Sequence, residues 1–247
     1  MPGLKPTKIP YGTKRWDPAR GCTMHCEYCF HRLRVAPRMA RFCAKCGRHE
    51  VHQHPELLDG PAKMRKPQVV LVCFGGDLFD AARPGRDIQQ VIDAAKAAPQ
   101  HTYVFLTKNP GRAWIWTDEF KRHGNWWMGI TVEDQELAGL RLPYWAGDGM
   151  NLWLSVEPQR SAIRYDHLPS VPKWIVVGCD SRRGEDRYPW DDDWARQADV
   201  FCTANKIPLF VKQIRTADGT LVRERRRFPK DLRFQETPWA MSEKRGR

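Results

Sequence analysis

The sequence predicts an α/β fold with parallel strands that form a partial or full (β/α) barrel. Short apolar runs alternate along the chain with segments of helical periodicity. The run at 68–74 (QVVLVCF) is apolar almost throughout, as expected for a strand covered on both faces of a parallel sheet. Charged side chains also recur directly after the strands, at the end where parallel barrels carry their chemistry.

The elements are expected in a regular order. Strands are predicted at 14–18, 68–74, 102–106, 126–130, 151–154, 174–177 and 208–211. Helices are predicted at 87–98, 113–123, 135–142 and 190–205. In the first helix, apolar residues at 88, 91, 92 and 95 share one face. Even spacing of the strands near 102, 126, 150 and 174 leaves room for βα units, which favours a barrel over an open doubly wound sheet.

The 247 residues suffice for a single domain spanning 1–247. We expect an N-terminal arm at 1–13, a Cys/His-rich insertion at 40–66 and a basic C-terminal segment at 215–247. No apolar run approaches a membrane span and the N-terminus does not resemble a signal peptide, so a cytoplasmic protein without membrane contact is expected. In that compartment the eight cysteines are expected to be metal ligands and core thiols.

The charged residues after the strands define a candidate site at the barrel mouth. Any one of them can equally be a capping or surface residue, but six charges in a structural core would be costly, so their repetition argues for a site. These residues are Asp77, Lys108, Glu133, Glu157, Asp180 and Lys212.

The most informative stretch is 21–30 (GCTMHCEYCF), in which Cys22, Cys26 and Cys29 have C-x3-C-x2-C spacing. A tight loop can turn three thiolates toward one point, one fewer than a closed [4Fe-4S] cluster takes from protein. One iron would then be open to a ligand that is not protein. Two other interpretations stay open: structural thiols, or a zinc site completed by His25 or His31, although zinc sites more often use two distant C-x2-C pairs.

A second metal site is indicated within the insertion. Cys43 and Cys46 form a C-x2-C pair followed by glycine, and His49, His52 and His54 come soon after. Two of these histidines, with His52 and His54 preferred, can complete a tetrahedral Cys2His2 zinc site. The alternative is a polar surface loop with incidental histidines.

The net charge of +12 is typical of proteins that bind polyanions. Eleven tryptophans add side chains able to stack on bases. Basic residues precede and follow the cysteine loop and recur toward the C-terminus, a pattern that attracts phosphate backbones without reading sequence. The alternative is a charge that serves solubility alone.

The cysteine spacing, with Tyr28 just before the last cysteine, resembles the signature of the radical S-adenosylmethionine (SAM) superfamily. Within it, the chain resembles the phage Gp37/Gp68-like family over most of 14–233, which implies the cytoplasm of a bacterial or phage-infected host cell. The matching segments are DLF at 77–79, LTKNP at 106–110, GITVEDQ at 129–135, LSVEP at 154–158, VVG at 176–178 and PLFVKQ at 208–213. Two departures are the compact first cysteine gap and GCDS at 178–181, where the family more often shows GGES.

The resemblance implies a [4Fe-4S] cluster on Cys22, Cys26 and Cys29 and SAM as its partner. SAM would be split into methionine and a 5'-deoxyadenosyl radical that abstracts hydrogen from substrate, with the electron coming from a reducing donor such as flavodoxin or ferredoxin. The cofactor-binding residues implied by the resemblance are Tyr28, Gly75, Gly76, Asp77, Thr131, Glu133 and Ser155. The implied catalytic candidates are Cys179, which is equally well a buried thiol, Lys108 and Glu157; Lys108 and Lys212 could pair with the SAM carboxylate or a substrate phosphate.

The expected function is that of a radical SAM enzyme acting on a nucleic-acid base or a modified base, as in phage-type DNA hypermodification, isomerisation or repair. The partner is then nucleic acid, DNA in the first place, whose base would be flipped into the site; the protein is expected to be a monomer. Within the same class, a nucleotide or small metabolite is the alternative substrate. From a different class, the alternative is a non-catalytic, zinc-bearing nucleic-acid-binding protein.

Overall fold

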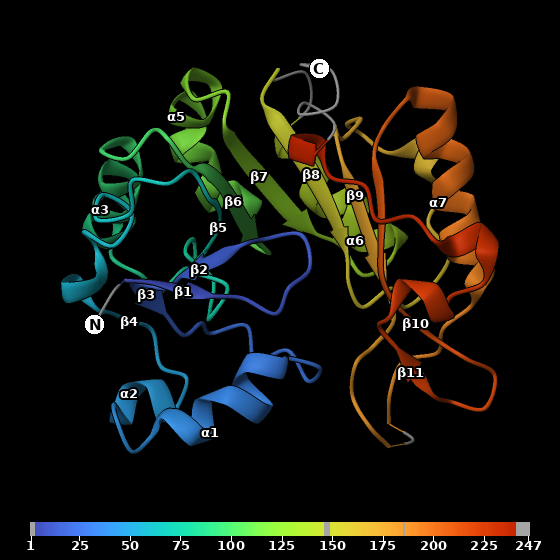
Figure 1. Cartoon of the computed structure of the whole chain (residues 1–247), viewed down its shortest axis with the longest axis horizontal. Coiled ribbons are helices and arrows are strands. Elements are labelled where there is room, and N and C mark those ends of the chain that lie inside the picture. Colours follow the sequence, from blue (N-terminus) through green and yellow to red (C-terminus); the bar gives the residue numbers. More distant parts are fainter. Residues whose placement is uncertain (1–2, 146–148, 185, 241–247) are drawn as a thin grey trace. The chain divides into compact units, whose positions relative to one another are not determined.

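The structure is a computed structural model that describes residues 3–145, 149–184 and 186–240 (Figure 1). It divides into two compact units, one of Met1–Gly129 with Gly149–Asn151 and one of Ile130–Asp148 with Leu152–Arg247. The first two residues of the expected arm and 241–247 of the basic C-terminal segment lie outside the described residues.

The α/β fold is confirmed. The described residues form a mostly parallel nine-stranded sheet in the order β1-β2-β5-β6-β7-β8-β9-β10-β11, and a two-stranded sheet of β3 and β4. The strands are β1 (Leu4–Pro6), β2 (Lys14–Trp16), β3 (Ala19–Arg20), β4 (His52–Gln53), β5 (Val69–Val72), β6 (Thr102–Thr107), β7 (Trp126–Thr131), β8 (Asn151–Val156), β9 (Ile175–Gly178), β10 (Leu209–Arg215) and β11 (Leu221–Val222). Strand β7 is divided between the units. Closure into a barrel stays a prediction.

The helices are mostly short. The α-helices are α1 (Ala36–Met39), α2 (Ala44–Gly47), α3 (Gly85–Lys96), α4 (Pro110–Ala113), α5 (Thr117–Arg122), α6 (Gln135–Arg141) and α7 (Asp192–Asn205). Single turns of other helix types are η1 (His31–Val35), η2 (Pro55–Leu57), η3 (Trp114–Trp116), η4 (Leu142–Trp145), η5 (Tyr165–His167), η6 (Arg225–Arg227) and η7 (Lys230–Leu232). None of the described helices is long and apolar enough to cross a membrane.

In the first unit, β2 pairs in parallel with β5, and β5 with β6. Helix α3 buries Ile88, Val91, Ile92 and Ala95, the face that the periodicity predicts. The predicted helix at 113–123 is instead broken into α4, η3 and α5. At the break the Thr117 hydroxyl donates to the Trp114 carbonyl over 2.6 Å, and such local side-chain bonds compete with helical ones.

The start of the chain differs from the expected extended arm. Residues 4–6 form β1, which pairs antiparallel with β2, and Leu4 is buried. A three-residue strand is too short to show a period of two in the sequence. Residues 31–47 form η1, α1 and α2, with Pro37 tolerated in the first turn of α1. Figure 1 shows α1 and α2 below the strands β3 and β4.

In the second unit, β8 pairs in parallel with β9, and β9 with β10. Helix α7 packs against β9 and β10, and Trp153 and Trp174 are fully buried with ring centroids 4.8 Å apart. The start of the basic C-terminal segment folds back as β11, antiparallel to β10. The parallel strand ends therefore present their following residues at one edge of each unit's sheet.

Candidate metal centres

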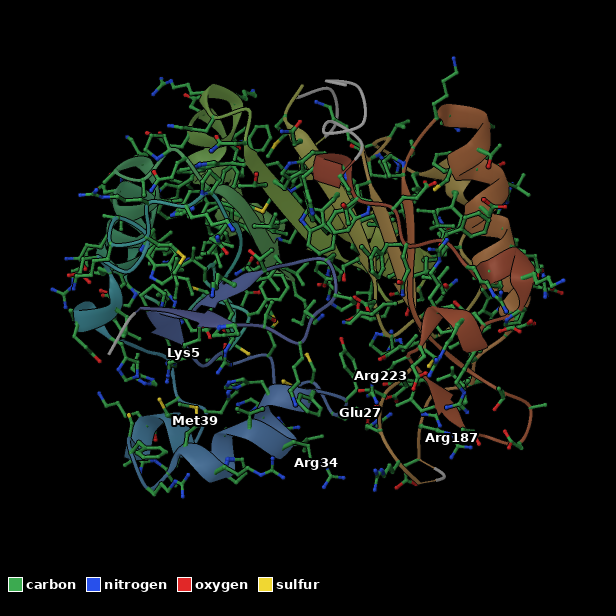
Figure 2. The ribbon with its side chains drawn as sticks, viewed as in Figure 1. Lys5, Glu27, Arg34, Met39, Arg187 and Arg223 are labelled. Carbon is green, nitrogen blue, oxygen red and sulfur yellow. The ribbon has the colours of Figure 1, made fainter. Side chains whose placement is uncertain are left out.

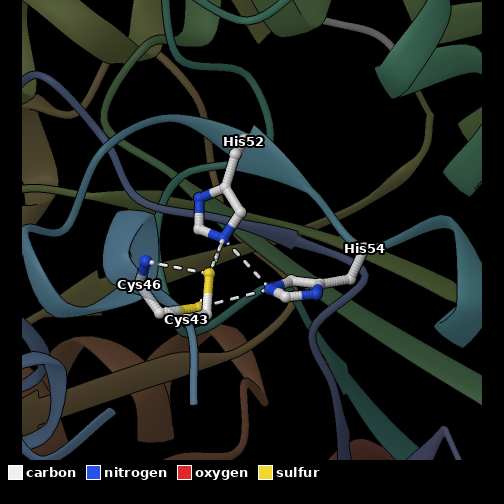
Figure 3. A group of neighbouring side chains, drawn as sticks. All are labelled: Cys43, Cys46, His52 and His54. Atoms are coloured by element: carbon white, nitrogen blue, oxygen red, sulfur yellow. Dashed lines mark hydrogen bonds between the residues drawn. The ribbon is translucent and has the colours of Figure 1, made fainter. Parts of the chain in front are cut away.

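Four side chains of the insertion form a group that can hold a metal ion, which we call the Cys/His centre (Figure 3). The ligand atoms of Cys43, Cys46, His52 and His54 all lie within 4.8 Å of one another. The Cys46 sulfur is 3.2 Å from Nε2 of both histidines, and those two nitrogens are 3.0 Å apart. The predicted Cys/His group is therefore confirmed, and its two thiols and two imidazoles are the donors that zinc takes in tetrahedral sites.

Local structure explains why these four side chains converge. Cys43 caps α2, and its sulfur accepts from the Cys46 backbone N–H over 3.4 Å. His52 lies in the extended β4 and His54 follows two residues later, so both side chains project from the same face of the strand. The short interval between the histidines is thus compatible with shared ligation.

The Nδ1 atoms of both histidines contact other groups, so it is their Nε2 atoms that can bind a metal. Nδ1 of His52 lies 2.8 Å from the Glu50 carbonyl, and Nδ1 of His54 lies 2.9 Å from the Glu56 carboxylate. Burial lowers the pKa of His52, which favours the neutral imidazole that binds metal. The Cys46 backbone N–H lowers the pKa of Cys43, while burial raises that of Cys46.

The cysteine loop, 21–30, follows β3 directly. Cys22, Cys26 and Cys29 are half-buried, and Cys29 N donates to the Cys26 carbonyl over 3.1 Å. The Arg32 backbone N–H donates to the Cys29 sulfur over 3.4 Å. The ammonium of Lys108 lies 5.4 Å from the Tyr28 ring centroid, so one predicted strand-end residue does lie beside the loop.

Two buried residues that the sequence interpretation missed hold this loop. Asp80 is fully buried, and its carboxylate accepts from the Thr23 N–H over 2.7 Å and from the Thr23 hydroxyl. Arg83, 1% exposed, donates to the carbonyls of Arg20 and Gly21 over 2.9 and 3.2 Å. Asp80 ends the same DLFD run that supplied Asp77, which is the signal that could have found it.

The three thiols of the loop are distinct from the other five cysteines. All eight cysteines lie in the described part of the chain: two belong to the Cys/His centre, and Cys73, Cys179 and Cys202 are buried.

His49 faces the cysteine loop instead of the Cys/His centre. It is buried, its φ is +58°, and its Nε2 lies 3.6 Å from the Cys22 sulfur. Its Nδ1 lies 3.3 Å from Nδ1 of His31. Burial lowers the pKa of His49 and raises that of Cys22 to about 12. The sequence offered His49 only as one of three candidate zinc ligands.

The Gly75-Gly76-Asp77 turn is closely packed. Gly75 N donates to the Asp17 carboxylate over 2.9 Å, and a Cβ on Gly76 would lie 2.4 Å from the Gly21 carbonyl oxygen. The buried Asp77 carboxylate accepts from the Thr107 hydroxyl and from the Lys108 and Phe79 N–H groups, each within 2.9 Å. Burial raises the pKa of Asp77. Its carboxylate joins two strand ends, and its contact with SAM stays a prediction.

The strand-end residues of the second unit are paired with cations. Glu133 lies 2.8 Å from Arg141, whose guanidinium also donates to the Thr131 carbonyl. Glu157 lies 2.9 Å from Lys212.

The remaining candidate residues of the second unit are Ser155, Cys179 and Asp180. Ser155 contacts Glu157 at 3.5 Å, Cys179 is buried, and Asp180 lies 2.7 Å from Arg182. The structure thus places Asp77 and Lys108 in the first unit and the other four charges in the second. Their convergence on one mouth stays a prediction.

Alkylation of the metal-free protein at pH 8 should separate exposed from buried thiols. Cys43, whose pKa is lowered, should react first, because the thiolate is the nucleophile. Burial raises the pKa of Cys73, Cys179 and Cys202 to about 12, well above pH 8, so their thiolate fractions fall about a thousandfold. Peptide mass spectrometry measures each rate. Unfolding in urea should equalise the rates; native Cys179 reacting as fast as Cys43 would contradict its burial.

Comparison with known proteins places this α/β chain with its two cysteine groups in a family. The model of the DUF5131 family, described as a protein of unknown function, matches residues 6–237. The chain belongs to that family. The match includes the cysteine loop and the Cys/His centre. Neither the curated proteins nor the solved structures gave a match.

Proposed function

We propose that this protein is a radical SAM enzyme whose [4Fe-4S] cluster is held by Cys22, Cys26 and Cys29. The observation that carries the proposal is a loop with three half-buried thiols, while the other five cysteines are in the Cys/His centre or buried. Such a cluster would supply the one-electron reductive cleavage of SAM to methionine and a 5'-deoxyadenosyl radical. A low-potential donor such as flavodoxin or ferredoxin supplies the electron. A partial barrel is the finer architecture that we propose for the sheet.

The chain's own residues orient this site. Asp80 holds the loop backbone through Thr23, and the Arg32 backbone N–H donates to the Cys29 sulfur. Lys108, whose ammonium lies beside the Tyr28 ring, is proposed to pair with the SAM carboxylate or a substrate phosphate. The second centre, of Cys43, Cys46, His52 and His54, is proposed to hold zinc as a closed four-ligand structural site.

A nucleic-acid substrate is supported by the surface that follows the loop, residues 30–42. Phe30 and Phe42 are 60% and 71% exposed, and the Arg41 guanidinium lies 4.5 Å from the Phe42 ring centroid. Arg34 (labelled in Figure 2) and Arg38 are exposed on the same segment. Exposed aromatic rings stack on unpaired bases and arginines bind phosphates, so we infer a base of DNA as the first candidate and a nucleotide as the second.

A second candidate function is a non-catalytic, zinc-bearing nucleic-acid-binding protein. The observation that favours it is the 3.6 Å between the Cys22 sulfur and His49 Nε2. Zinc bonds of about 2.3 Å to sulfur and 2.0 Å to nitrogen, at a tetrahedral angle, separate the two atoms by about 3.5 Å. In this alternative His49 closes a Cys3His site and no position remains open for SAM.

Anaerobic reconstitution with iron and sulfide tests both candidates. The wild-type protein should turn brown, bind about four irons per chain and, with dithionite and SAM, release 5'-deoxyadenosine. Cys26→Ala should lose the iron and the product, whereas Cys202→Ala, at a buried thiol in α7, should keep both. A colourless protein with two zinc ions per chain would instead support the second candidate.

A further inference from the structure

The chain between the ligands of the Cys/His centre packs against the residue before Cys22. Gly21 has φ of +74°, and a Cβ there would lie 1.9 Å from the Glu50 carbonyl oxygen. His49, next to Glu50, points its Nε2 at the Cys22 sulfur. Both contacts come from the five residues between Cys46 and His52, whose ends a bound metal would fix.

The backbone joins the same two segments a second time. Strand β3, which leads into the cysteine loop, pairs antiparallel with β4, so that Arg20 lies opposite His52. Beyond this pair, His54 N donates to the Pro18 carbonyl over 2.6 Å. Both histidine ligands are therefore carried by chain that is hydrogen-bonded to the approach to Cys22.

Two buried arginines also connect the Cys/His centre with the chain that leads into the cysteine loop. Arg20 donates to the Cys46 sulfur over 3.4 Å and to the Asp17 carbonyl over 3.1 Å. Arg83 donates to the His52 carbonyl over 3.0 Å as well as to the carbonyls before the cysteine loop. Since most of these contacts are buried, we expect a shift of the four Cys/His side chains to displace the cysteine loop as well.

We propose that the metal of the Cys/His centre controls the geometry of the cysteine loop, with His49 as the positioning residue between them. Metal binding supplies the order that such a short segment cannot obtain from a core of its own. With the segment fixed, the His49 imidazole is held against the Cys22 sulfur and can donate a hydrogen bond to it. Hydrogen bonds to cluster sulfurs tune cluster potentials, so the role of His49 toward iron rests on the proposed function.

The coupling is reciprocal by thermodynamic necessity. If zinc in the Cys/His centre favours the loop geometry that binds iron, iron in the loop must tighten the binding of zinc by the same factor. Coupling of this kind is commonly 5- to 150-fold in affinity, about 1 to 3 kcal/mol.

The decisive test uses iron-free full-length protein, so that it does not depend on a cluster. Wild-type protein is prepared zinc-loaded and zinc-depleted, and the alkylation rates of Cys22, Cys26 and Cys29 are followed by peptide mass spectrometry. We expect zinc to slow alkylation of Cys22 by about fivefold or more. His49→Asn tolerates the positive φ, and should keep one zinc while losing the effect of zinc on Cys22.

Arg48→Gln is the matched control, because its exposed side chain pairs with Glu50 on the same segment. It should keep both the zinc and the protection of Cys22. An unchanged Cys22 rate after zinc removal would overturn the inference, as would protection that persists in His49→Asn.

Reconstitution of the same samples with iron separates this inference from the proposed function. If zinc protects Cys22 through His49 but no cluster forms, the coupling stands and the radical SAM proposal fails. If clusters form equally with and without zinc, and Cys22 reacts equally in both, the function stands and the coupling fails. If both hold, the cluster of His49→Asn should show a more negative reduction potential, because one donor to its sulfur is lost.

Discussion

Replacement of Arg83 by methionine is expected to lower the free energy of unfolding by about 3 kcal/mol. The side chain is 1% exposed and donates to the carbonyls of Arg20, Gly21 and His52. Methionine fills much of the volume but donates nothing, so each carbonyl that Arg83 contacts loses a hydrogen-bond donor. Because these acceptors belong to both metal-binding segments, the variant should also bind less zinc and less iron.

Urea denaturation of the metal-free proteins, followed by tryptophan fluorescence, measures the change in stability. Arg86→Met is the control, since the Arg86 side chain is 85% exposed and its contact with Asp87 spans 3.6 Å. It should change the free energy of unfolding by less than about 0.5 kcal/mol. Equal effects of the two substitutions would show that the carbonyl contacts of Arg83 contribute little.

Gly21→Ala is expected to destabilise the protein by about 2 to 4 kcal/mol and to abolish assembly of the cysteine loop. The left-handed φ of +74° disfavours a side chain, and the added Cβ would lie 1.9 Å from the backbone oxygen of Glu50. Relief requires the cysteine loop and the segment at 49–50 to separate. Iron content after reconstitution should fall sharply, and zinc content should fall less because its four ligands are unchanged.

Gly139→Ala supplies the comparison for an unconstrained glycine. Gly139 lies in α6, and an ideal Cβ there meets nothing within 4 Å among the described residues. The substitution should raise the free energy of unfolding by about 0.5 to 1 kcal/mol, since alanine favours the helix. Thermal unfolding of the two variants measures the expected loss and gain of stability, and metal analysis measures their iron and zinc contents. A Gly21→Ala protein with wild-type iron content would contradict the packing argument.

Much of the fold could be predicted because its signals are local. The strands β5 to β10 begin within one residue of their predicted starts, since buried parallel strands are apolar runs bounded by turns. Helix α3 buries the face that its periodicity indicates. The strands β1, β3, β4 and β11 could not be found in this way. Two or three residues hold too little pattern, and their pairing depends on distant segments.

The candidate site, like the fold, could be predicted from the sequence only in part. Cys43, Cys46, His52 and His54 could be selected from spacing alone, because a metal ligand set within a dozen residues is local chemistry. The roles of Asp80 and His49 could not be read from the sequence, since each contacts a cysteine-loop residue 27 or 57 positions away. Neither partner is implied by the spacing of the thiols.

The carboxylates that follow the strands show a further limit of prediction from sequence. Glu157 directly follows β8, as the sequence predicts, but its partner, Lys212, lies within β10, far along the chain. A parallel sheet brings such residues together only after the strands have paired. The sequence therefore indicates where charges occur, whereas their pairing, which decides how much each carboxylate can offer a ligand, depends on the tertiary structure.

Asp80 and Arg83, the two buried residues that hold the cysteine loop, come later in the chain than the loop itself. All seven candidate metal ligands are synthesised by residue 54, whereas the buried partners of the cysteine loop, Asp80 and Arg83, are translated later. Nascent chains begin to fold from the N-terminus as they emerge. We therefore expect the thiols of the cysteine loop to lack their buried anchors until the chain has grown past Arg83.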